Sequence, residues 1–125
     1  MMQYWLVTAT WTSGDVLAKF IDPKPTRNYP YWELEPSVGE ENPGLSGLRR
    51  QMRKGDRIAV KGTPKGGRIA IRALGIVKRL AKTNSSVYVK WLKGAPVKTV
   101  EWNGCSDAIE GPFPSPVWLA EIFSV

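Results

Sequence analysis

Two runs of alternating apolar residues, joined by a glycine-rich turn, constrain the fold more than any other part of the sequence. The first run, DRIAVKG (56–62), predicts a short strand that buries Ile58 and Val60. Its alternate residues are expected to face the other way: Arg57, Ala59 and Lys61. The second run, RIAIRALGIVKRL (68–80), predicts a longer strand with a β-bulge at Gly75, where the alternation slips. A chain with these two runs is built around a sheet.

Other segments rich in β-branched and aromatic residues add strands to this pair. QYWLVTATW (3–11) predicts a buried first strand that ends at Trp11. VYVKW (87–91) and VKTVEW (97–102) predict two later strands of a meander.

Three segments carry helix signals. TSGDVLAKF (12–20) offers Thr12 or Ser13 as an N-cap, and LSGLRRQMRKG (45–55) gives an amphipathic, basic helix that ends at Gly55. SPVWLAEIF (115–123) predicts a short C-terminal helix, because a capping serine is followed by proline. Residues 21–44 contain five prolines and are expected to form an irregular, functional connection.

The order of these elements predicts an α+β fold in a single domain, 1–125. One strand, two helices in a long connection, four strands and a final helix suit a small mixed β-barrel. We expect about five to six strands, with two or three short helices packed outside.

Positive charge is concentrated in one stretch of this chain, whose formal net charge is +7. Residues 49–82 contain twelve Lys or Arg against one acid, Asp56. Such a one-signed field suits phosphates, although a solvated basic face is the alternative for any single residue. The expected phosphate ligands lie on the basic helix and on the two strands: Arg49, Arg50, Arg53, Lys54, Arg57, Arg68 and Arg72. Pairing of the two strands would join Arg57, Lys61, Arg68 and Arg72 into one patch.

The residue types present argue against an enzyme. The chain has no histidine and one cysteine, Cys105, which excludes His-based triads, the usual zinc sites and an intrachain disulfide. The carboxylates form no paired motif, and KGTPKGGR (61–68) lacks the phosphate-loop spacing. We expect no catalytic residue, metal or cofactor. The N-terminus has no basic leader region and no apolar run reaches bilayer length, which predicts a cytoplasmic protein without a membrane partner.

Three of the six tryptophans occupy positions that could form a binding slot. Trp11 ends the first strand, Trp32 lies among prolines, and Trp91 ends a later strand. A core position is the alternative for each, because most tryptophans in a small domain are buried. Aromatic rings that converge at strand ends can stack a flat base, which is worth about 1 to 3 kcal/mol per base.

Several blocks in series resemble the EVE-type domains of the PUA superfamily. The blocks are Trp11-Thr12-Ser13, Trp32, GDRIAVK (55–61), IRALGIV (71–77) and VKW (89–91). The likeness covers roughly residues 4–102 and is greatest with the N-terminal domains of McrB-type methyl-directed restriction ATPases.

This resemblance implies a non-catalytic reader that accepts a base flipped out of DNA, methylated cytosine or adenine, in an aromatic pocket. The pocket residues that it implies are Trp11, Thr12, Ser13, Trp32, Lys61 and Trp91. The implied partners are modified double-stranded DNA and an ATPase or nuclease, as a subunit or a fused domain. Flipping costs a few kcal/mol, which stacking and hydrogen bonds to the base can return.

Two other hypotheses remain open from the sequence. A reader of modified or single-stranded RNA, like the related YTH domains, would use the same barrel without flipping a base. An enzyme acting on nucleic acid is the third, and the absence of histidine counts against it.

Overall fold

The computed structural model describes residues 3–25, 27–62, 65–80, 86–92, 98–101 and 108–113 of the 125-residue chain. The helices within these residues are α1 (Leu17–Ile21), α2 (Pro36–Glu41) and α3 (Pro43–Gln51). The strands are β1 (Tyr4–Thr8), β2 (Thr10–Trp11), β3 (Gly14–Asp15), β4 (Tyr31–Glu33), β5 (Arg57–Lys61), β6 (Arg68–Leu80), β7 (Ser86–Trp91), β8 (Lys98–Glu101) and β9 (Ile109–Phe113). The α+β class is therefore confirmed. The predicted helix at 115–123 lies outside the described residues, and none of the helices within them is long and apolar enough to cross a membrane.

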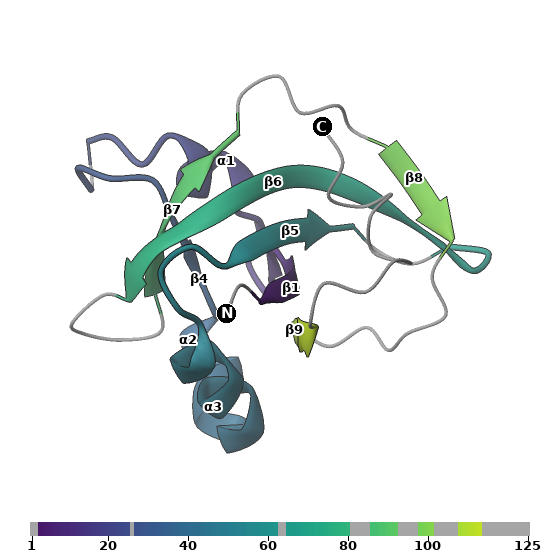
Figure 1. Ribbon diagram of the computed structural model, residues 1–125, viewed down its shortest axis with the longest axis horizontal. Helices are drawn as coiled ribbons and strands as arrows, with labels where there is room; N and C mark the ends of the chain where they lie inside the picture. The colour runs from purple at the N-terminus through teal and green to yellow at the C-terminus, as the bar shows by residue number, and fades with distance from the viewer. Residues whose placement is uncertain are drawn as a thin grey trace.

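One curved sheet organises the described part of the chain. Its strands follow the order β4-β7-β6-β5-β1-β9, and β8 pairs with the first part of β6. β1 and β5 are parallel, and the other pairs are antiparallel. Figure 1 shows β6 as a long curved strand, with β8 at one end and α2 and α3 together near the other. β4 and β9, at the two ends of the order, do not pair within the described residues, so a closed barrel is not confirmed.

The sheet nevertheless curls back on itself. Trp32 of β4 donates a hydrogen bond from its indole Nε1 to the carbonyl oxygen of Thr8, at the end of β1, over 2.8 Å. Because β4 and β1 are separated by β7, β6 and β5 in the order, this bond requires strong curvature. The helical connection from β1 to β5 runs as a parallel crossover, which needs the long segment that the sequence supplies.

Apolar side chains are buried on both faces of this sheet. The larger cluster includes Trp5, Phe20, Trp32, Ile58 and Val60, and lies on the face that α1 and β4 cover. The second cluster lies on the other face and consists of Leu6, Ala59, Ile69, Ile71, Leu74 and Val100. Ala59 faces away from Ile58 and Val60, as the alternation predicts. Ala59 and Lys61 are both buried, so Lys61 cannot belong to the predicted basic patch; β5 is a central strand covered on both faces.

The long strand β6 has two shifts in its pairing register, and neither lies at Gly75, where a bulge was predicted. The pairing with β5 shifts register between Val60 and Lys61, which leaves Arg72 as the extra residue. A second shift, in the pairing with β7, falls at Lys78. Gly75 is regularly paired with both neighbours, and a Cβ there would overlap the side chain of Val89. The slip in alternation is real, but the glycine provides space for packing and forms no bulge.

The first helix begins later than the capping pattern predicts. β2 and β3 form a two-residue hairpin, and Thr12 and Ser13 lie at its tip. Helix α1 follows at Leu17, whose backbone N–H donates to the Asp15 carboxylate over 3.0 Å. The hairpin therefore occupies the residues that were expected to form the first helical turn.

Two further elements occupy the segment that was expected to be irregular. Residues 21–44 contain β4, which pairs with β7, and α2, which has proline at its first position. Helix α3 starts early, at Pro43, where the Asn42 side chain accepts a hydrogen bond from the backbone of Leu45. It ends at Gln51, so Gly55, with φ of +92°, serves the turn into β5 rather than the helix end.

Candidate binding site

The predicted pocket between Trp11 and Trp32 has no room for a base. Trp32 is fully buried, and its indole N–H donates a hydrogen bond to the Thr8 carbonyl. Trp11 is half-buried and packs edge-on against Phe20, with ring centroids 6.0 Å apart. The cavity beside the two indoles measures about 30 Å³. That volume is enough for a water molecule but not for a base. The prediction that the two rings lie near each other is confirmed, because both line this cavity. The prediction that Trp32 offers a stacking surface is wrong, because Trp32 is fully buried.

The two hydroxyl residues predicted for the pocket lie outside it. Thr12 and Ser13 are exposed at the tip of the β2–β3 hairpin, and neither lines the cavity. The backbone N–H of Thr12 donates to the Glu35 carboxylate over 2.9 Å, which fixes the hairpin to the start of α2. The observed role of this tip is therefore structural.

Lys61, predicted to bond a base edge, is enclosed in the protein. Its side chain is about 1% exposed and forms an ion pair with Glu110 of β9, which is also buried. The partner lies 49 residues away in the sequence, so no local pattern could have identified it. Lys61 holds two distant strands together and does not face a ligand.

The predicted phosphate ligands fall into two separate groups. Arg68 and Arg72 belong to the part of β6 near β8: Arg72 forms an ion pair with Asp15, and Arg68 donates to the Thr99 carbonyl over 3.0 Å. The second group lies near the other end of β6, on the last turn of α3, on the segment that leads into β5 and at the first residue of β5: Arg49, Arg50, Arg53, Lys54 and Arg57. Measured along the curved strand, Arg68 and Lys78 are ten residues apart, a chain length of about 30 Å. The single patch predicted from Arg57, Lys61, Arg68 and Arg72 does not form.

Members of the second group differ in how well they could hold a phosphate. Burial, with a smaller contribution from the charge of Arg50, lowers the pKa of Arg49, and its Nε has no hydrogen-bond partner among the described residues. Arg57 is half-buried and donates to the Gly55 carbonyl over 2.7 Å. Arg50, Arg53 and Lys54 are exposed, which makes them the better candidates.

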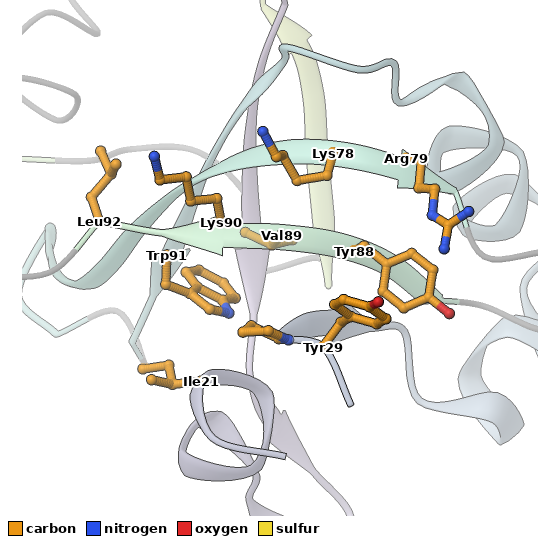
Figure 2. Close-up of a pocket in the computed structure, with 10 residues that line it drawn as sticks. Ile21, Tyr29, Lys78, Arg79, Tyr88, Val89, Lys90, Trp91 and Leu92 are labelled. Carbon is orange, nitrogen blue, oxygen red and sulfur yellow. The ribbon is translucent and has the colours of Figure 1, made fainter. Parts of the chain in front are cut away.

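An open groove of about 760 Å³ lies along β7. Three aromatic side chains line it, and Figure 2 shows them along one side: Tyr29, Tyr88 and Trp91. Three cations also line it: Lys78, Arg79 and Lys90. The remaining lining residues are apolar, namely Ile21, Pro30, Val89 and Leu92. We call this hollow the β7 groove.

The β7 groove exists because β4 covers only half of β7. β4 pairs with β7 from Ser86 to Tyr88, and the Pro30 carbonyl accepts one more hydrogen bond, from Val89, over 3.1 Å. Beyond that point the residues facing Lys90 and Trp91 come from the preceding connection and from the end of α1. No described strand pairs with this side of β7 beyond Val89, which leaves an open trough there.

The aromatic side chains of the groove are held in place by specific contacts. The Trp91 indole donates to the Phe20 carbonyl in α1 over 3.1 Å. Tyr29 and Tyr88 meet edge to face, with centroids 5.8 Å apart, and the Arg79 guanidinium lies 4.8 Å from the Tyr88 ring centroid. Tyr29 is 60% exposed although it is a large aromatic residue. Tyr88 and Trp91 are half-buried. Preorganised, partly exposed rings of this kind offer a stacking surface to a ligand.

A partly buried ion pair supports the segment that carries Tyr29. Arg27 donates to the Glu33 carboxylate over 3.2 Å and to the Ser86 hydroxyl over 3.0 Å, and its guanidinium lies 3.9 Å from the Tyr31 ring centroid. Burial raises the pKa of Glu33, and the charge of Arg27 opposes that shift. These contacts link residue 27 to β4 and β7, so the nearby Tyr29 is presented from a braced connection.

Sequence reasoning found one member of this groove and missed the others. Of the predicted pocket residues, Trp91 lines it, and Tyr88 and Lys90 alternate with the buried Val87 and Val89 in VYVKW. That alternation was a signal for an exposed aromatic-and-cationic face. Tyr29 left no comparable signal, because its position depends on the pairing of β4 with β7.

No protein-family model and no curated protein matches this chain. The resemblance to EVE-type domains therefore remains a sequence-based expectation. The function is inferred below from the geometry and charge of the groove.

Proposed function

We propose that the protein is a non-catalytic nucleic-acid-binding module whose base site is the β7 groove. The observation that carries this proposal is the meeting of three aromatic rings and three cations along one groove, with no carboxylate among the described residues that line it. Flat apolar walls suit a nucleobase, and the adjacent positive charges suit its phosphates.

The expected energies are sufficient for measurable binding. Stacking on Tyr29, Tyr88 or Trp91 would contribute about 1 to 3 kcal/mol per base. The three cations, Lys78, Arg79 and Lys90, would add a contribution that weakens with salt. An acidic peptide would also meet the cations, but the aromatic rings favour a planar ligand.

We assign base recognition to the β7 groove because the pocket predicted at Trp11 and Trp32 is too small. A flipped base needs a closely fitting pocket, whereas the cavity at Trp11 and Trp32 holds about 30 Å³. The β7 groove is open, so a base that is already unpaired can enter it directly. In this proposal the curled sheet corresponds to the barrel of the EVE-type domains that the sequence resembles. An ATPase or nuclease partner is proposed from that resemblance alone.

Preference for a methylated base is part of the same proposal. One buried methyl group contributes about 0.8 kcal/mol, which corresponds to roughly four-fold in affinity. The apolar residues that line the groove, among them Ile21 and Leu92, would provide that burial.

Substitution of two tyrosine rings of the groove tests the proposal. Tyr29→Ala and Tyr88→Ala are each expected to weaken binding of a fluorescein-labelled single-stranded oligonucleotide by about 5- to 150-fold, the equivalent of one lost stacking contact. Fluorescence anisotropy at fixed salt measures this. Tyr29→Phe keeps the ring and should bind like wild type, and so should Thr12→Ala and Ser13→Ala at the hairpin tip. Absence of binding by wild type, or unchanged affinity in both alanine variants, would refute the groove as a base site.

A further inference from the structure

The cations of the β7 groove continue onto a second basic surface. Lys78 and Arg79 line the groove and directly follow Val77. The backbone of Val77 accepts a hydrogen bond from Gly55 and donates one to Asp56, each over 2.8 Å. These two bonds place the turn that contains Arg53 and Lys54 beside the groove end of β6. We call residues 53–55 the basic turn.

The basic turn is held by a buried acid. Asp56 is about 1% exposed, and its carboxylate accepts hydrogen bonds from the Arg53 backbone over 2.9 Å and from the Trp5 indole over 3.0 Å. Gly55 adopts a left-handed conformation, with φ of +92°, that closes the turn. Asp56 is the single acid of residues 49–82, and its burial keeps it away from the surface where Arg53 and Lys54 are exposed.

We infer that the β7 groove and the basic turn form one continuous site for a single-stranded nucleic acid. One base occupies the groove, and the backbone runs over Lys78 and Arg79 to Arg53 and Lys54. This inference rests on the proposed function and adds to it the strandedness of the partner and the path of its backbone.

Charge and shape together favour a single strand over a duplex. The groove is an open trough beside the edge of β7, and the cations lie on one side of its rings (Figure 2). A single strand can place a base there without unpairing, whereas a duplex must first spend a few kcal/mol to extrude it. A positively charged track beside a stacking surface is the usual arrangement for binding single strands.

The salt dependence of binding tests the backbone path. Five phosphate contacts, at Lys78, Arg79, Lys90, Arg53 and Lys54, predict a slope of log K against log salt of about −3.5 for a single strand. The double variant Arg53→Gln/Lys54→Gln is expected to change this slope by about 1.4, to about −2.1. The matched control, Lys65→Gln/Arg68→Gln, removes the same charge at the other end of β6 and should leave the slope unchanged.

The possible outcomes separate this inference from the proposed function. If Tyr88→Ala loses affinity while the basic-turn variant keeps the wild-type slope, the backbone path is wrong and the base site stands. Equal slope changes in the basic-turn and control variants would also overturn the path, because any surface charge would then suffice. A duplex of the same sequence that binds as tightly as the single strand would overturn the strandedness.

One further variant guards against a misfolded double mutant. The Arg53 side chain donates to the Arg50 carbonyl over 2.9 Å, so its loss affects the end of α3. Lys54→Gln alone avoids that contact and is expected to change the slope by about 0.7. No change in this variant, with thermal unfolding like that of wild type, would count against the inference.

Discussion

Lys61→Ala is expected to lower the free energy of unfolding by about 3 to 5 kcal/mol, because it leaves a buried carboxylate without its cation. Lys61 ends β5, Glu110 lies in β9, and β1 separates the two strands. Their ion pair is almost completely removed from water, so Glu110 cannot recover hydration in the variant. Urea unfolding followed by tryptophan fluorescence measures the loss.

A paired replacement provides the control for this prediction. Lys61→Met combined with Glu110→Leu removes both charges and is expected to recover most of the lost stability, since apolar pairs of similar volume often replace buried ion pairs without cost. A loss below about 1 kcal/mol in Lys61→Ala would contradict the buried pairing, because that is the range of exposed ion pairs. Where the variants fold, binding of nucleic acid should match wild type, since Lys61 does not reach the groove.

Asp56→Ala is expected to cost about 3 kcal/mol or more, because one carboxylate accepts three hydrogen bonds that join the start of β1 to the turn before β5. It accepts hydrogen bonds from the backbone of Gln3 over 3.1 Å, from the Trp5 indole over 3.0 Å and from the backbone of Arg53 over 2.9 Å. Hydrogen bonds to a charged group contribute about 1.5 to 3 kcal/mol each, and donors left buried without partners are costly. Chemical denaturation measures the change in the free energy of unfolding.

Asp15 offers a matched control of the same residue type. Its carboxylate is half-exposed and pairs with Arg72, so Asp15→Ala should cost at most about 1 kcal/mol. The hydrogen bond from Arg72, and then that from the Leu17 backbone, lowers the pKa of Asp15. Its small contribution is therefore present at neutral pH and is lost as the pH falls through the lowered pKa. Equal losses in Asp56→Ala and Asp15→Ala would contradict the central role of Asp56.

Local patterns were enough to predict most strands of the sheet. Alternation of apolar residues identified β5, β6 and β7, because a strand with a buried face repeats every two residues. β4 and α2 were missed within a proline-rich segment, since β4 is specified by its pairing with Ser86 to Tyr88, which lies far away in the sequence. Closure of the predicted barrel likewise depends on pairing between strands that are far apart in the sequence, such as β4 and β9, and a local pattern carries no information about such pairing.

The candidate site was harder to predict than the fold. The excess of basic residues was evident, but the sequence could not show that Lys61 forms an ion pair with Glu110 and Arg72 one with Asp15. It also could not show that Trp32 is sealed in the core while Tyr29 is exposed. Burial and ion pairing are properties of the assembled sheet, so residue type alone assigned the wrong aromatic residue to the surface.

Photocrosslinking of a 4-thiouridine-containing single-stranded oligonucleotide, with the modified peptides mapped by mass spectrometry, tests the central claim most directly. A base held in the β7 groove should crosslink to Tyr29, Tyr88 or Trp91, which line it. Crosslinks confined to the Thr12–Ser13 hairpin tip or to the Arg68–Arg72 part of β6, with none in the groove, would contradict the account.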